Sequence, residues 1–223
     1  MYLLEQKTIE MQIRLQRNNV SSEEITEILL SKEASIMLTV LASSHCNADH
    51  LRLVAADPNH FIRVSVIKHP NIPEDIQNMY LGYDTYTKQL LALHGNLTKN
   101  VIDKLLDEKD VIIRKMVMQN KNMSESNLLK ALKDKDISIR KEAAMHINGT
   151  HNTVDEALND AVTSVRKVAM LNKNATIDNI KKALTDVSPA VKMYGYRNPN
   201  ITMELKNEAI KDPDIMYFLL KKS

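Results

Sequence analysis

Asparagine recurs with threonine or serine along this chain in a pattern that has a known chemistry. Asn-x-Ser/Thr is the acceptor sequence for N-glycosylation, and it occurs at Asn96, Asn122, Asn148, Asn174 and Asn200. Each of these asparagines follows the one before it by 26 residues. Independent glycan acceptors have no reason to keep a constant spacing, so the triplets indicate a repeated structural unit.

A basic residue stands eight positions before each triplet and sets the register of the unit. The series, which a spacing of 25 extends upstream, is Arg63, Lys88, Arg114, Arg140, Arg166 and Lys192. Apolar residues occur one position before it and three after it, as in Ile139 and Ala143. Because positions four apart share one helical face, this pattern predicts the buried stripe of a first short helix in each unit.

Acidic residues precede the basic position by six. They are Asp57, Glu108, Asp134, Asp160 and Asp186, with Asp212 continuing the series and Gly82 interrupting it. An acid just before an apolar run predicts a helix N-terminus, through capping and the helix dipole.

The triplets themselves predict the turn between two helices. Asparagine stops helices and tolerates left-handed backbone, and serine or threonine caps the helix that follows. In this interpretation Asn174 ends one helix and Thr176 caps the next. Ser21, in a sixth triplet at Asn19, is expected to be a cap as well, so no glycan is expected on any of these asparagines.

Two short helices cannot bury their own apolar stripe, whereas stacked units bury a continuous core. We therefore expect an all-α, right-handed α-solenoid of about seven to eight two-helix repeats of 25–26 residues. The expected organisation is one domain over residues 1–223. Residues 1–36 form a degenerate N-terminal capping unit, 37–210 the repeats and 211–223 a C-terminal cap.

The unit combines Asp-x5-Arg, Asn-x-Asn-x-Thr/Pro and Ala-Leu-x-Asp. It resembles the leucine-rich repeat variant and related HEAT-like helical repeats over about residues 36–220, most closely in "DPNHFIRVSVIKHPNIPEDI" at 57–76. The resemblance implies a binding scaffold and ion pairs between the arginine and acid positions. The pairs it implies join Arg63, Arg114, Arg140 and Arg166 to Asp57, Glu108, Asp134 and Asp160 or their neighbours. Residues 80–105 depart from the pattern, with Gly82 in place of the acid and Lys88 in place of the arginine.

Composition supports a helical protein without disulfides or membrane spans. The 223 residues include only 4 Gly and 6 Pro, and 43% are hydrophobic. The one cysteine, Cys46, excludes an intrachain disulfide. No apolar stretch resembles a signal peptide or approaches 18 residues, so we expect a soluble, cytoplasmic protein with no membrane partner. The net charge of +2 is too small to require a nucleic-acid partner.

No nucleophile motif, phosphate-binding loop, dinucleotide fingerprint or HExxH motif is present, so neither enzymatic activity nor a cofactor is expected. The first hypothesis is a non-catalytic scaffold that binds a protein partner through an extended surface. Tyr80, Tyr83 and Tyr86 cluster in the irregular unit, and tyrosine is favoured at interaction hot spots. The alternative for these tyrosines is local repacking around the missing acid.

The second hypothesis is nucleic-acid binding along a basic ridge in the C-terminal half. The ridge comprises Lys115, Lys141, Lys167 and Lys192. Successive units would space these lysines roughly 10 Å apart, as neighbouring helices are, and phosphate contacts would make binding salt-dependent. A solvated face is the structural alternative.

The seven histidines do not predict a metal site. His69, His94 and His146 share one position of the unit but belong to different units, too far apart for bonds of about 2 Å to zinc. His45, Cys46 and His50 are closer in sequence, yet they supply too few ligands, and no metal is expected.

The spacing argument can be checked on the protein from its native source. Mass spectrometry of the intact chain should give the unmodified mass, because the asparagines serve the repeat. A glycan on any of the six triplets would contradict this interpretation.

Overall fold

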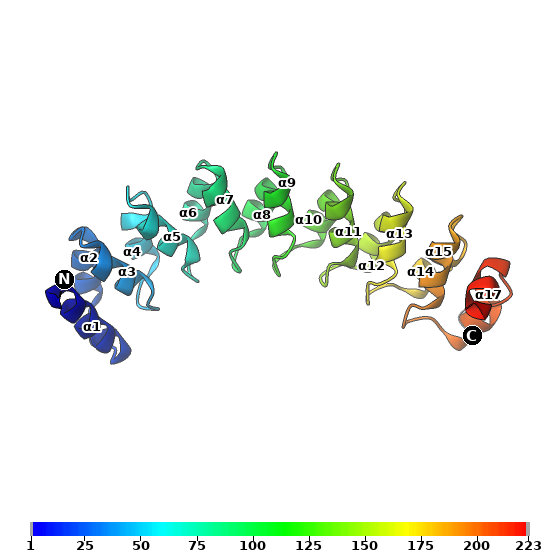
Figure 1. Cartoon of the computed structure of the whole chain (residues 1–223), viewed down its shortest axis with the longest axis horizontal. Coiled ribbons are helices and arrows are strands. Elements are labelled where there is room, and N and C mark those ends of the chain that lie inside the picture. The colour runs from blue at the N-terminus through cyan, green and yellow to red at the C-terminus, as the bar shows by residue number, and fades with distance from the viewer. Residues whose placement is uncertain (1, 222–223) are drawn as a thin grey trace. The chain divides into compact units, whose positions relative to one another are not determined.

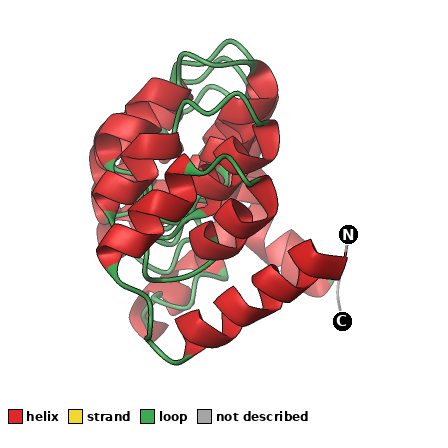
Figure 2. Ribbon diagram, turned by 90° about the vertical axis from the view of Figure 1, so that its left-hand side faces the viewer, coloured by secondary structure: helices red, strands yellow, loops and turns green. Residues whose placement is uncertain are grey.

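The structure is a computed structural model that describes the backbone of residues 2–221 and the side chains of residues 5–221. Within this range the chain forms seventeen α-helices and no strand (Figure 1). The described residues are helices joined by short loops, as Figure 2 also shows. Residues 1, 222 and 223 of the predicted terminal caps lie outside the described residues.

The helices alternate between two positions of the repeat. The odd-numbered helices are α1 (Tyr2–Gln16), α3 (Ala34–Leu41), α5 (His60–Lys68), α7 (Thr85–Ala92), α9 (Val111–Val117), α11 (Ile137–Met145), α13 (Thr163–Ala169), α15 (Pro189–Tyr196) and α17 (Pro213–Leu220). The even-numbered helices are α2 (Ser22–Leu30), α4 (Ala48–Val54), α6 (Glu74–Tyr80), α8 (Lys99–Leu106), α10 (Glu125–Ala131), α12 (His151–Leu158), α14 (Ile177–Leu184) and α16 (Met203–Ala209).

The chain divides into two compact units, Met1–Val101 and Ile102–Ser223. In the first, α1, α3, α5 and α7 pack each on the next, and α2 packs on α4. In the second, α9 to α17 pack in the same way among the odd helices, and α10, α12 and α14 among the even ones. The predicted all-α class and α-solenoid arrangement of stacked two-helix repeats are confirmed. The single domain over residues 1–223 stays a prediction.

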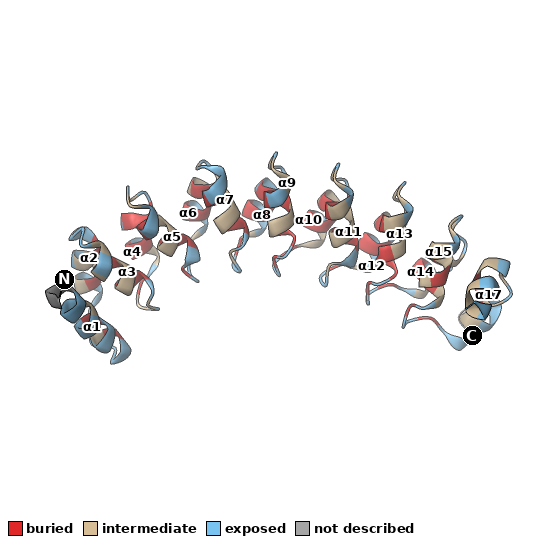
Figure 3. Cartoon of the chain, viewed as in Figure 1, coloured by how far each residue is buried: buried red, intermediate tan, exposed pale blue. Residues whose placement is uncertain are grey.

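The predicted apolar stripe forms the core of the stack. Ile113, Ile139 and Val165 are buried, and so are the residues one turn later on the same helices, Val117, Ala143 and Ala169. Figure 3 colours the buried parts of the helices red. Gly195 occupies this second position in α15. A Cβ atom there would lie 3.0 Å from the Cβ of Ala183 in α14, so the glycine permits this close helix contact.

The asparagines of the triplets bind the preceding repeat. Asn148 donates its side-chain amide to the carbonyls of Lys121 and Met123, at 2.6 and 2.9 Å. The same contact recurs from Asn96 to Pro70, from Asn174 to Gly149, and from Asn200 to Lys173 and Ala175. Among the described residues other than glycine, only Asn18 and Lys32 have positive φ. The turns therefore need asparagine for its amide donor, and the expected left-handed role is wrong.

The capping role of the hydroxyl residues holds at most of the triplets. Thr176 accepts the backbone N–H of Asn179 at 3.3 Å, and the Asn179 side chain accepts the Thr176 N–H at 2.9 Å, which completes a capping box. Ser21 accepts from Glu24 at 3.2 Å, as predicted. Thr150 differs, because its hydroxyl donates to the Glu125 carboxylate and makes no cap bond.

The cap at Thr176 has a measurable stability. Thr176→Ala should lower the free energy of unfolding by roughly 1 kcal/mol. Urea denaturation monitored by circular dichroism measures this change. Thr185→Ala at the other end of α14 is the matched control, because its hydroxyl donates to the carbonyls of Lys181 and Lys182, at 3.4 and 3.0 Å, and accepts no N–H of the first helical turn. Equal losses in the two variants would contradict the capping role.

Candidate interaction surfaces

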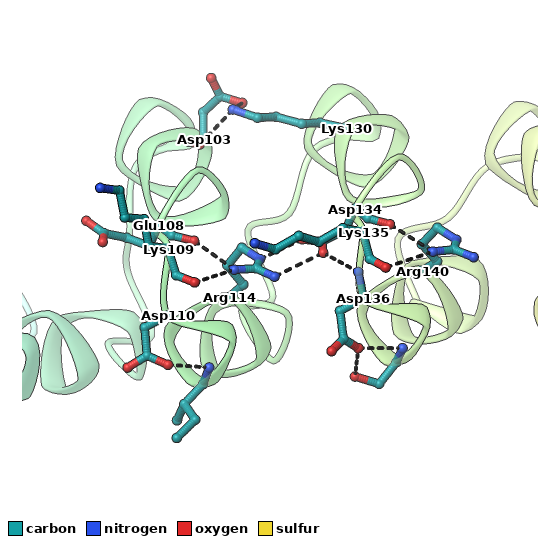
Figure 4. A network of polar contacts seen from close by, with 12 residues as sticks. Asp103, Glu108, Lys109, Asp110, Arg114, Lys130, Asp134, Lys135, Asp136 and Arg140 are labelled. Atoms are coloured by element: carbon teal, nitrogen blue, oxygen red, sulfur yellow. Dashed lines mark hydrogen bonds and ion pairs between the residues drawn. The ribbon is translucent and has the colours of Figure 1, made fainter.

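A ladder of ion pairs joins successive repeats in residues 102–223. Arg114 of α9 donates its Nε and Nη2 to the two carboxylate oxygens of Asp134, at 2.6 and 3.1 Å (Figure 4). The same bidentate contact joins Arg140 to Asp160 and Arg166 to Asp186. Each acid stands 20 residues after its arginine, so every pair bridges one repeat and the next.

The arginines also brace the turn before their own helix. Arg114 donates Nη1 to the carbonyls of Glu108 and Lys109, at 2.8 and 3.0 Å (Figure 4). The residue six positions earlier thus offers its backbone carbonyl to the arginine. The family resemblance implied ion pairs within one repeat. The structure corrects this, because each arginine pairs with the acid of the following repeat.

The acids that pair with Arg140 and Arg166 lie two residues before the helix cap. Asp160 accepts the backbone N–H of Val162, which is the N-cap residue of α13, at 2.8 Å. Asp186 does the same for Ser188, the N-cap of α15. The expectation that these acids cap the first helices directly is therefore corrected at both positions. It is confirmed at Asp212, which is the N-cap of α17 and accepts the backbone N–H groups of Asp214 and Ile215.

The ladder also controls the ionisation of its acids. Burial alone would raise the pKa of Asp160, but the hydrogen bonds from Arg140 and Val162 outweigh burial and hold that pKa below its usual range. The pKa of Asp186 is lowered in the same way, with Arg166 and Ser188 as the donors. Both acids are consequently charged partners of the arginines at neutral pH.

Lys192 belongs to this ladder as well. It occupies the arginine position in α15, and its Nζ lies 2.8 Å from carboxylate oxygens of both Asp212 and Asp214. Hydrogen bonds to these acids raise the pKa of Lys192. The charge of Lys192 is thus neutralised by two carboxylates of the same fold, whereas a phosphate-binding lysine needs an unpaired charge.

The other three lysines of the predicted ridge lie half-exposed on α9, α11 and α13. Lys115 lies near two acids: hydrogen bonds from Ser138 lower the pKa of Asp136, and the Lys115 charge lowers it further. Burial raises the pKa of Glu142 despite the nearby charge of Lys115. Lys141 and Lys167 follow on the next two helices, and Lys167 Nζ stands 5.2 Å from the centroid of the Tyr194 ring.

The structure separates the three clustered tyrosines. Tyr80 is fully buried and donates its hydroxyl to the Ala55 carbonyl at 2.8 Å, and burial raises its pKa. Tyr83 is half-buried, and the Arg63 guanidinium lies 5.9 Å from its ring centroid. Tyr83 follows Arg63 by 20 residues, so its ring stands at the ladder position that carries an acid in later repeats. Tyr80 and Tyr83 thus have structural contacts that account for their positions.

Tyr86 differs, because it belongs to an exposed aromatic patch. We define this patch as His60, Phe61 and Tyr86, at the start of α5 and α7. Phe61 is 68% exposed and Tyr86 is 53% exposed. The His60 ring contacts both, with its centroid 5.9 Å from that of Phe61 and 5.4 Å from that of Tyr86. Sequence reasoning missed Phe61, although it stands two residues before Arg63 as Tyr86 stands two before Lys88.

The repeated histidines have structural partners. The His94 ring accepts the Asn96 N–H at Nδ1, 3.2 Å away, while Nε2 lies 3.0 Å from the His69 carbonyl. Burial lowers the pKa of His94 and of His146, which favours the neutral ring. Among the described residues, no group of three His, Cys, Asp or Glu side chains could hold a metal ion.

The cysteine segment is likewise part of the packing. Cys46 is buried, burial raises its pKa to about 11, and its Sγ lies 3.4 Å from the Val40 carbonyl. His50 accepts the Asn47 N–H at Nδ1 and has Nε2 3.1 Å from the Ser22 hydroxyl oxygen.

Comparison with known proteins identifies the fold. No family model and no curated protein sequence matches this chain. A solved structure described as a leucine-rich repeat variant with a novel repetitive protein structural motif matches 86% of this chain and 78% of its own, with a TM-score of 0.54 and 15% identity. The resemblance suggested by the repeat unit is confirmed at the level of fold. No helix in the described part of the chain is both long and apolar enough to cross a membrane.

The ladder predicts that two arginine substitutions differ greatly in their effect on the free energy of unfolding. Arg114→Met should lower the free energy of unfolding by about 3 kcal/mol, because it leaves a buried carboxylate without its partner. The control is Arg52→Met, whose exposed side chain also joins two repeats through Asp75. It should cost far less, because water screens exposed pairs. Chemical denaturation of both variants tests this, and equal losses would contradict a structural ladder.

Proposed function

We propose that this chain is a non-catalytic helical-repeat scaffold that binds a protein partner, with the aromatic patch of His60, Phe61 and Tyr86 as a principal contact. The proposal includes one scaffold domain over residues 1–223. It also includes a cytoplasmic location, which is consistent with a chain that has a single cysteine.

The exposure of Phe61 and Tyr86 is the observation that carries this proposal. The chain has no Trp, 2 Phe and 7 Tyr, so aromatic side chains are scarce. Two of them nevertheless stand exposed beside a histidine ring. Full burial of a large apolar side chain is favourable by about 1.5–3 kcal/mol, and such rings are the usual anchors of protein interfaces. Their position at the helix starts leaves them accessible to a partner.

A non-catalytic role is supported by the location of the perturbed groups. Shifted pKa values mark catalytic sites when they belong to residues that converge in a cleft. Here the lowered pKa values of Asp160, Asp186 and Asp212 arise in the ion-pair ladder, and the raised pKa of Cys46 arises from burial. These shifts belong to contacts that hold the repeats together.

Nucleic-acid binding has less support. The arginines of the ladder and Lys192 are matched by carboxylates, so the proposed ridge is reduced to Lys115, Lys141 and Lys167. Asp136 and Glu142 further reduce the positive potential near Lys115. Three lysines remain on this ridge, which is few for a strong phosphate-binding track.

The proposal predicts that a double variant, Phe61→Ala/Tyr86→Ala, loses its partner. Tagged wild type and variant would be used to capture proteins from the source cells, with circular dichroism to show equal folding. A protein bound by the wild type should be missing from the variant. With that protein purified, calorimetry should show binding weakened at least about tenfold, as expected for hot-spot residues.

Leu53→Ala/Leu93→Ala is the matched control, because both leucines are about as exposed as Tyr86 and lie in the same unit. It should capture the same proteins as the wild type. An identical set of captured proteins for the wild type and the aromatic variant would overturn the proposed contact.

A further inference from the structure

The odd helices of the second compact unit carry a second surface, which we call the two-row strip. Its cationic row is Lys115, Lys141 and Lys167, on α9, α11 and α13. Its apolar row comprises Met145 at the end of α11, Ile147 in the turn after α11, and Leu171 in the turn after α13. Met145 and Leu171 each stand four residues after a lysine. Because residues four apart share a helical face, Met145 lies one turn from Lys141 on α11. Leu171 lies in the turn that follows the helix of Lys167.

The apolar row is open to solvent. Met145 is 46%, Leu171 is 53% and Ile147 is 80% exposed. In contrast, the apolar positions that stack the repeats, such as Ile139 and Val165 on the same helices, are fully buried. The core therefore does not require these three side chains, and their place beside the lysines gives the surface a mixed cationic and apolar character.

The spacing of the strip matches an extended polypeptide. Helices α9, α11 and α13 pack each on the next, and packed helices lie roughly 8–10 Å apart. A polyproline II segment has three residues per turn and rises about 3.1 Å per residue, so every third residue lies on the same face and advances by about one helix spacing. Carboxylates three residues apart would meet successive lysines, and apolar residues between them would meet Met145 and Leu171.

We propose that the two-row strip binds an extended acidic segment of a protein partner, with a carboxylate at every third position and apolar residues between. Charge complementarity to the three lysines selects the acidic side chains. The apolar row selects aliphatic side chains, which a peptide can supply and the backbone of a nucleic acid cannot. This surface lies in residues 102–223 and the aromatic patch in residues 1–101, so the inference does not depend on that patch.

The strip favours a peptide over a nucleic acid. Single-stranded nucleic acids stack their bases on aromatic side chains of the protein. Beside these lysines the structure records one such ring contact, between Lys167 and Tyr194. Asp136 and Glu142 near Lys115 would repel a continuous line of phosphates. A peptide carries its charges at discrete positions, so its carboxylates can face the lysines while the uncharged residues between them face Asp136 and Glu142.

A labelled peptide tests the inference directly. The probe is a fluorescein-labelled (Glu-Leu-Pro)₄ peptide, whose prolines keep it extended. Fluorescence anisotropy with the full chain should show saturable binding at low salt. The comparison probes are (Lys-Leu-Pro)₄, a peptide of the same composition with its glutamates adjacent, and a single-stranded and a double-stranded DNA of equal charge.

Two variants locate the binding surface. Lys141→Glu/Lys167→Glu should weaken binding of the acidic peptide roughly tenfold or more, because two attractions become repulsions. Lys133→Glu/Lys181→Glu makes the same change in net charge at exposed lysines outside the strip, and it should retain most of the affinity. Met145→Ala/Leu171→Ala should weaken binding by a factor that salt does not change.

Each alternative result would overturn the inference. These results are no saturable binding of the acidic peptide, equal weakening by the two lysine variants, or equal binding of the peptide with adjacent glutamates. Tighter binding of either DNA, with a steep salt dependence, would assign the strip to nucleic acid instead. Phe61→Ala/Tyr86→Ala should bind the peptide like the wild type, so failure of the aromatic contact and failure of the strip can be told apart.

Discussion

The contact between a cation on one repeat and a carboxylate on the next is the interaction on which the rest of the second unit depends. A pair of short helices has one apolar stripe and nothing of its own to cover it, so each repeat is stable only against its neighbours. Apolar packing alone would tolerate sliding of one pair along the next. Arg114, Arg140 and Arg166 oppose sliding, because a bidentate guanidinium–carboxylate contact is satisfied in one register only. The value of a mostly buried ion pair lies in this specificity more than in net stability.

A second set of polar contacts joins successive repeats at the turns. Asn148, Asn174 and Asn200 donate their amides to carbonyls of the preceding repeat. Without these donors, carbonyls in the turns between the helices would face the neighbouring repeat unpaired, at a cost comparable to a lost hydrogen bond. The ion pairs and the asparagine bonds thus hold the two sides of each repeat junction. One variation occurs between α5 and α7, where the Tyr83 ring takes the place of the acid beside Arg63.

Because the interior positions are occupied by these contacts, function has to be sought at the positions that the repeat leaves free. Outward residues of the odd helices vary from one repeat to the next: Phe61 and Tyr86 in the first unit, lysines with methionine or leucine in the second. Such variation on a constant framework is how stacked repeats form extended binding surfaces. The two surfaces differ in chemistry, so they suit different parts of a partner or different partners.

The sequence by itself determined the helical class, the repeat length, the apolar stripe and the caps at Ser21 and Thr176. All of these follow from residue types at short, fixed spacings within one helix or turn, and such local geometry is encoded directly in periodicity. Only the tertiary structure decided which acid each arginine binds, why asparagine recurs in the turns and which of three neighbouring tyrosines is exposed. These outcomes join residues 20 or more positions apart, such as Arg114 with Asp134, or depend on how one repeat covers another, as at Tyr80. Periodicity shows that such residues recur, but the stacking of the helices determines which of them meet.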